Sequence, residues 1–105
     1  MKIHSALQLL IDATNHGDSE ALLEAFTEDA LLIDFGRVFH GRSEIVRWDR
    51  NENIGTQNHI EITAVKHLPK ATELEISVSG NGYNGPGHFL CEFKDGLISR
   101  LTITS

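Results

Sequence analysis

The hydrophobic period of this chain changes near residue 57, and this change restricts the fold more than any other feature of the sequence. Apolar and polar residues alternate from Gln57 to the end, which predicts half-buried β-strands. Much of the preceding sequence repeats its apolar residues every three to four positions, as amphipathic helices do. Helices followed by antiparallel strands indicate the α+β class. We therefore expect one domain over residues 1–105, with three helices packed on a curved, mainly antiparallel sheet.

Three helices and two strands are predicted before residue 57. The first helix carries Ile3, Leu7, Leu10, Ile11 and Thr14 on one face and stops at Gly17. The other expected segments are a helix over 19–26 with Asp18 as its N-cap, strands over 30–35 and 38–40, and a helix over about 42–53. A cone-like cavity between the helices and the sheet follows from this layout.

The strands after residue 57 are divided by three turn signals. These are Leu68-Pro69-Lys70, the glycine-rich stretch 81–87 and the Lys94-Asp95-Gly96 hairpin signal. The glycine-rich stretch lacks the following helix that a phosphate loop requires. We therefore interpret it as a hairpin connection.

Composition excludes several classes of partner and site. A formal net charge of −6 leaves no basic patch for nucleic acid. No apolar run approaches the roughly 20 residues of a membrane span, so a cytoplasmic location is expected. Cys91 is the single cysteine, and the histidines lack chelating spacings, so we expect neither a disulfide nor a metal site. No cofactor is expected either.

Three phrases in the first half resemble the nuclear transport factor two-like superfamily. They are His-Gly-Asp-Ser-Glu-Ala-Leu at 16–22, Phe-Thr-Glu-Asp-Ala at 26–30 and Phe-His-Gly-Arg-Ser-Glu-Ile at 39–45. The whole chain is similar to the polyketide-cyclase-like (SnoaL-like) and ketosteroid-isomerase-like branches, and the resemblance implies a cystatin-like cone. This fold serves isomerases, cyclases and dehydratases as well as binding and dimerising modules.

The resemblance implies one catalytic candidate, Asp34, at the position where ketosteroid-isomerase-like relatives have an acidic residue. The relatives have a tyrosine where this chain has about Leu10, and an acid where it has about Phe89. Both expected oxyanion donors are missing, which argues against steroid isomerisation. Asp34 is either a base in a desolvated pocket or a solvated acid that begins the turn at Gly36.

His40 and Tyr83 are the candidate acid partners of Asp34. His40 precedes the third helix near the expected cavity, and Tyr83 could fold over the cavity mouth from its loop. The alternatives are a surface histidine and a tyrosine that packs locally. If the protein is an enzyme, we expect cofactor-independent isomerisation, cyclisation or dehydration with Asp34 as the base.

The predicted pocket holds a small apolar molecule between the helices and the sheet. Its expected wall consists of Leu10, Leu32, Trp48, Asp49, Tyr83 and Phe89. Trp48 would serve as a flat apolar surface, whether it packs in the core or lines the pocket. Asp49 and Glu52 either complete a carboxylate pair with Asp34 or are simply solvated. Cys91, between Phe89 and Phe93 on one strand face, is interpreted as a small buried hydrophobe.

The outer face of the sheet is the expected contact between two copies of the chain. Leu90 and Ile98 are apolar residues left over on the last two strands, and relatives commonly pair through this face. A homodimer is therefore expected. The alternative to an enzyme is a non-catalytic module that binds a ligand or only dimerises.

Overall fold

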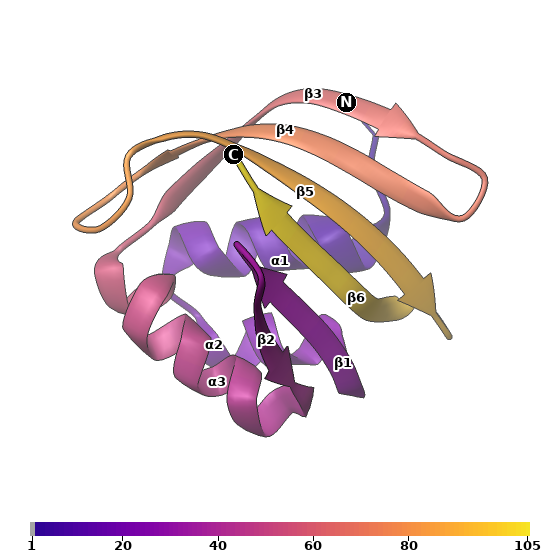
Figure 1. Cartoon of the computed structure of the whole chain (residues 1–105), viewed down its shortest axis with the longest axis horizontal. Coiled ribbons are helices and arrows are strands. Elements are labelled where there is room, and N and C mark those ends of the chain that lie inside the picture. Colours follow the sequence, from indigo (N-terminus) through magenta and orange to yellow (C-terminus); the bar gives the residue numbers. More distant parts are fainter. Residues whose placement is uncertain (1) are drawn as a thin grey trace.

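Three helices pack against the concave side of one curved six-stranded sheet in the computed structural model, which describes residues 2–105 (Figure 1). The helices are α1 (Ser5–His16), α2 (Ser19–Glu24) and α3 (Gly41–Glu52), followed by the short 3-10 helix η1 (Ile54–Thr56). The strands are β1 (Phe26–Asp34), β2 (Arg37–His40), β3 (His59–His67), β4 (Ala71–Ser79), β5 (Gly85–Lys94) and β6 (Leu97–Thr104). The predicted α+β class is confirmed.

The first two helices meet at a tight corner that their cap residues explain. Gly17 adopts a left-handed conformation with φ of 72° and donates its N–H to the carbonyls of Ala13 and Thr14. This geometry closes α1 without a side-chain penalty. Asp18 then accepts a hydrogen bond from the backbone N–H of Ala21 over 3.1 Å. Both predicted boundary residues are confirmed.

The second helix is shorter than predicted because the sheet takes over its last residues. It ends at Glu24, and Phe26 already belongs to β1. Phe26 pairs with Ile98 of β6, and the Ile98 N–H donates to the Ala25 carbonyl over 2.8 Å. The prediction of a helix through Phe26 is therefore wrong. Phe26 satisfies the helical period, but its long-range pairing decides its backbone conformation.

The sheet has the order β2-β1-β6-β5-β4-β3 and is antiparallel except where β1 lies parallel to β6. Two hairpins in it have two-residue turns with both central residues at positive φ. One is Asp95-Gly96, with φ of 53° and 81°, and the other is Phe35-Gly36, with φ of 50° and 83°. Two positive φ values define the turn type whose twist matches that of paired strands. The predicted 94–96 hairpin is confirmed.

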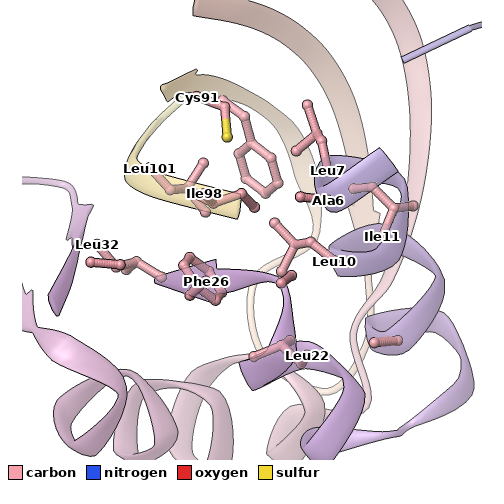
Figure 2. Close-up of a cluster of buried hydrophobic side chains, with 14 of the residues drawn as sticks. Ala6, Leu7, Leu10, Ile11, Leu22, Phe26, Leu32, Cys91, Ile98 and Leu101 are labelled. Atoms are coloured by element: carbon pink, nitrogen blue, oxygen red, sulfur yellow. The ribbon is translucent and has the colours of Figure 1, made fainter. Parts of the chain in front are cut away.

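The core lies between α1, α2 and the inner face of the sheet (Figure 2). Leu10 of α1 points toward Phe26 and Ile98, and all three are at most 1% exposed. Ile98 is inside because the β5–β6 register shifts between the pairs Glu92–Arg100 and Phe93–Ile98, which leaves Ser99 without a partner in the ladder. The prediction that Ile98 lies on the outer face is therefore wrong.

Leu90 remains half-buried, with its neighbours Phe89 and Cys91 turned to the core. It is the apolar residue that the predicted dimer surface retains.

Within residues 2–105, no helix has the length and apolar character needed to cross a bilayer.

Candidate functional site

A cavity of about 410 Å³ opens between the end of α3, η1 and the inner face of the sheet. Its lining combines apolar and polar residues. The apolar wall consists of Phe35, Ile60, Ile76, Val78, Tyr83, Phe89 and Ile103. The polar and small wall residues are Asp34, Arg37, Asn51, Glu52, Asn53, Thr56, Asn58, Gly82, Gly87 and Thr104. A largely apolar cavity with a few convergent polar groups is the usual form of a small-molecule site.

Asp34 reaches this cavity because it is the last residue of an alternating strand. Along β1 the side chains of Ala30, Leu32 and Asp34 are all turned inward. Asp34 is only 8% exposed, so its carboxylate needs donors. Its Oδ2 atom accepts hydrogen bonds from Trp48 Nε1 over 3.0 Å and from Arg37 Nη2 over 3.1 Å.

The other carboxylate oxygen of Asp34 is free of hydrogen bonds from the described residues. Oδ1 accepts no hydrogen bond from residues 2–105, and the same residues contain no buried side-chain oxygen without a partner. Oδ1 must therefore be accessible, and Asp34 belongs to the cavity wall. The carboxylate is thus held through one oxygen and open through the other, and the solvated-turn alternative for Asp34 does not describe this arrangement.

Arg37 connects Asp34 to α3 at the rim. Its guanidinium makes two hydrogen bonds to the Glu52 carboxylate, Nη1 to Oε2 over 2.8 Å and Nη2 to Oε1 over 2.5 Å. Hydrogen bonding to Glu52 raises the pKa of Arg37 above its ordinary value, so the guanidinium stays charged. Arg37 also lies over the ring of Phe39, 5.8 Å from its centroid. These contacts hold the guanidinium at the cavity mouth.

Phe35 stands at the mouth because the turn forces it outward. A phenylalanine at φ of 50° is sterically unfavourable, and its side chain is 56% exposed. Tyr83, on the β4–β5 loop, is 49% exposed and also lines the cavity. The cavity therefore has two exposed aromatic rings at its entrance.

Tyr83 and Phe89 are predicted wall residues that the structure brings to the cavity. The Tyr83 hydroxyl donates to the Pro86 carbonyl over 2.6 Å, so its proton is used within its own loop. This is the local packing that was the alternative for Tyr83. The predicted role as an acid partner of Asp34 does not fit this geometry.

Leu10 and Leu32 were predicted as wall residues, and this prediction is wrong. Both are at most 1% exposed and lie in the packed core beside Phe26 and Leu101 (Figure 2). Trp48, also predicted as a wall residue, is 5% exposed and does not line the cavity, but its Nε1 atom donates a hydrogen bond to the lining residue Asp34. Helix and strand periodicity identifies an inward side chain but does not distinguish a filled region from a hollow one.

Asp49 is also wrong as a wall residue, because it belongs to a buried polar network. It is 1% exposed and accepts hydrogen bonds from Ser19 Oγ over 2.8 Å and from Asn53 Nδ2 over 3.1 Å. Asn53 donates in turn to Thr14 Oγ1 over 3.0 Å. Asp49 therefore connects the three helices, and its carboxylate is not available to a ligand.

His40 lies too far from Asp34 to act on it directly. In the β1–β2 ladder His40 pairs with Leu31, whereas Asp34 pairs with Arg37. Three positions along a strand correspond to about 10 Å. His40 is exposed, and its backbone N–H donates to Glu44 Oε1 over 2.7 Å at the start of α3. This matches the surface-histidine alternative.

Arg37 is the charged lining residue that the sequence interpretation missed, and the apolar residues Phe35, Ile60 and Ile76 were missed as well. The segment 36–37 was interpreted as the turn, whereas the turn is Phe35-Gly36 and Arg37 is the strand partner of Asp34. A two-residue turn after Asp34 would have placed Arg37 directly opposite it. Among residues 2–105, no three His, Cys, Asp or Glu side chains lie close enough together to hold a metal ion.

The sequence and the fold were both compared with known proteins. The model of the SnoaL-like domain family matches residues 7–101. None of the curated proteins matches the chain. The structural neighbours include a candidate polyketide cyclase from Sinorhizobium meliloti, at 25% identity and a TM-score of 0.86, with 97% of this chain and 95% of that chain covered.

Two other neighbours share the fold at lower identity. A cystatin-fold protein from Novosphingobium aromaticivorans is 18% identical with a TM-score of 0.80, over 100% of this chain and 99% of that chain. A protein with a ketosteroid isomerase-like fold from Catenulispora acidiphila, solved in complex with trimethylamine, is 17% identical with a TM-score of 0.86, over 99% and 87%. The predicted cystatin-like, nuclear transport factor two-like fold is confirmed.

Proposed function

The chain belongs to the SnoaL-like domain family, and from this premise we propose that its cavity binds a small, mainly apolar molecule whose polar end meets Asp34. One observation carries the proposal. Asp34 lines a cavity of about 410 Å³ with its Oδ1 atom free of hydrogen bonds, while Oδ2 is held by Trp48 and Arg37. A carboxylate held in this way is an oriented hydrogen-bond acceptor in surroundings that exclude most water.

The apolar wall suits the hydrocarbon part of such a ligand. Ile60, Ile76 and Phe89 come from the three adjacent strands β3, β4 and β5, and all three line the cavity. Contact with these residues would remove apolar area from water at about 25 cal/mol per Å². The neighbour solved with trimethylamine is a case in which this fold was found with a small amine.

Proton transfer is the second candidate function, and the open Oδ1 atom favours it. A carboxylate fixed through one oxygen can accept a proton at the other from a substrate carbon or hydroxyl group, as isomerisation, cyclisation or dehydration requires. Arg37 is the charged donor beside this carboxylate, and it would stabilise negative charge that develops nearby. Phe89, at about the position where ketosteroid-isomerase-like relatives have a hydrogen-bonding acid, cannot donate a hydrogen bond from its side chain.

The intrinsic fluorescence of Trp48 tests the binding proposal. Trp48 is the single tryptophan and donates a hydrogen bond to Asp34, so a ligand at Asp34 Oδ1 should change the emission of Trp48. We expect small cyclic alcohols and ketones to change the emission in a saturable way, and Asp34→Asn to weaken alcohol binding about fivefold to tenfold, because hydrogen bonds to charged acceptors are stronger. The control is Asp29→Asn, an exposed acid on the same strand.

The binding proposal is wrong if no compound changes the emission of Trp48 or raises the melting temperature of the chain. Catalysis is tested separately, by deuterium exchange beside the carbonyl group of the ketones in heavy water. Exchange that is faster with the wild-type chain than with Asp34→Asn supports Asp34 as a base, and equal rates contradict it.

A homodimer through the outer face of the sheet and a cytoplasmic location are part of the same proposal. Leu90 is the half-buried apolar residue that supports the dimer contact. Light scattering after size-exclusion chromatography tests it, with Leu90→Lys as the variant expected to give a monomer.

A further inference from the structure

The charged side chains at the cavity mouth indicate which polar group a ligand carries. Three charged residues line the cavity: the carboxylates of Asp34 and Glu52 and the guanidinium of Arg37. Among residues 2–105, no lysine or histidine lines it. The cavity lining therefore has one surplus negative charge, in a chain whose formal net charge is −6. Such a field attracts cations and repels anions.

The open oxygen of Asp34 places the unsatisfied part of this charge in the cavity lining. Asp34 is only 8% exposed, with both of its hydrogen bonds on Oδ2. A buried carboxylate is stabilised most by a charged donor. Arg37 satisfies Oδ2 but shares its charge with both oxygens of Glu52. A second cation at Oδ1 would complete the pairing.

The two exposed aromatic rings at the entrance point to the same ligand. Phe35 and Tyr83 line the cavity from the β1–β2 turn and from the β4–β5 loop. The face of an aromatic ring attracts an ammonium group within about 6 Å of its centroid. The Tyr83 hydroxyl is bonded to Pro86, so the ring is held in its own loop. Rings at the entrance and a carboxylate inside form a path that favours positive charge.

We infer that the cavity selects a cationic amphiphile, a small molecule with a protonated amine and a hydrocarbon body. The amine meets Asp34 Oδ1 near Glu52, and the hydrocarbon body lies on Ile60, Ile76 and Phe89. This inference rests on the proposed binding function and makes it more specific. An anionic ligand on Arg37 is the opposite possibility, and it would have to replace the hydrogen bonds of Arg37 to Glu52 or Asp34.

Three compounds with one body and different charges test the inference. Phenylbutylamine, phenylbutanol and phenylbutyrate are titrated by calorimetry against the full chain at neutral pH. At this pH an alkylamine is protonated, because its ordinary pKa is about 10. We expect the amine to bind about tenfold more tightly than the alcohol, and the carboxylate to bind more weakly than either.

Substitutions of the charged lining residues test which of them causes the preference for the amine over the alcohol. Asp34→Asn is expected to make the amine and the alcohol bind about equally, and Glu52→Gln to reduce the preference. Arg37→Gln removes a competing cation and is expected to strengthen amine binding severalfold. Arg47→Gln has the same change of charge on α3 outside the cavity and should change nothing. In the Glu52, Arg37 and Arg47 variants the alcohol affinity reports whether the cavity is intact. In Asp34→Asn, whose alcohol binding is itself expected to fall, an unchanged melting temperature reports this instead.

The outcomes separate this inference from the proposed function. Equal binding of amine and alcohol by the wild-type chain overturns the inference and leaves the binding function in place. Tightest binding of the carboxylate, lost in Arg37→Gln, also overturns it and identifies an anion site. If none of the three compounds binds and the cyclic alcohols and ketones do not bind either, both proposals fail.

Discussion

The indole N–H of Trp48 donates a hydrogen bond to Oδ2 of Asp34 over 3.0 Å, and this bond links α3 to the end of β1. Both residues are buried, with 5% of Trp48 and 8% of Asp34 exposed, so the bond lies where little water can replace it. The same bond orients the carboxylate and leaves Oδ1 free of hydrogen bonds. Stability of the helix–sheet contact and geometry of the site therefore depend on one pair of residues.

Replacing Trp48 by phenylalanine should weaken both the fold and the site. The change removes one of the two donors to a buried carboxylate, and we expect a loss of about 2 kcal/mol in the free energy of unfolding. Ligand affinity should fall as well, because the carboxylate loses its orientation. Urea unfolding and calorimetric titration measure the two effects.

A double-mutant cycle with Asp34→Ala separates the hydrogen bond from the loss of packing. The two substitutions should be non-additive, with a coupling of about 1 kcal/mol. Additive losses would show that Trp48 contributes only through its volume.

Phe35→Asn should stabilise the chain and reduce ligand binding. Phe35 has φ of 50° in a two-residue turn, a conformation that asparagine tolerates better than phenylalanine. We expect a gain of about 1 kcal/mol in the free energy of unfolding. Loss of the exposed ring should weaken amine binding at the same time.

The matched control for this prediction is Asp95→Asn, which occupies the corresponding position of the β5–β6 turn with φ of 53°. It should change stability little and ligand binding not at all. A Phe35→Asn variant that is less stable than the wild type would show that packing of the ring exceeds the backbone strain.

Gly55→Ala should destabilise the chain severely. A Cβ atom at Gly55 would lie 1.4 Å from the Arg50 carbonyl oxygen, so the chain between α3 and η1 would have to move. We expect a loss of more than about 3 kcal/mol in the free energy of unfolding. At Gly82, also near the cavity, the nearest atom to a new Cβ is at 3.4 Å, so Gly82→Ala should be almost neutral. Similar melting temperatures for the two variants would contradict this account.

The buried thiol of Cys91 should make the free energy of unfolding depend on pH in the alkaline range. Burial raises the pKa of its thiol from 9.0 to about 12, with a smaller contribution from Glu92. The folded chain therefore keeps the proton over a range in which the unfolded chain releases it. The resulting stability is fully present below about pH 9 and is lost as the pH rises toward about 12.

Urea unfolding at about pH 8 and about pH 10.5 checks this prediction. The wild-type chain should lose more stability between the two conditions than Cys91→Ala, in which every other titrating group is retained. The same loss in both chains would show that Cys91 does not contribute. The buried thiol should also react slowly with alkylating reagents until the chain is unfolded.

Short-range patterns in the sequence determined much of the fold. The change from helical to alternating period separated the helices from the strands, and Gly17, Asp18 and Asp95-Gly96 marked their boundaries. These features depend on neighbours a few residues apart, so they can be recognised without the partner elements. Asp34 was predicted as a site residue from the resemblance to ketosteroid-isomerase-like relatives, at the end of an apolar run.

Only the tertiary structure decided which inward residues meet the cavity. Leu10 and Leu32 fill the core, whereas Ile60 and Ile76 line the cavity, although the period of its own helix or strand places each of the four on an inward face. The pairing with β6 similarly ended α2 before Phe26, and the shifted register turned Ile98 inward. Arg37 and Glu52 meet across 15 positions of sequence. Periodicity assigns a side chain to a face, but the neighbour opposite that face is set by strand register and helix packing over the whole chain.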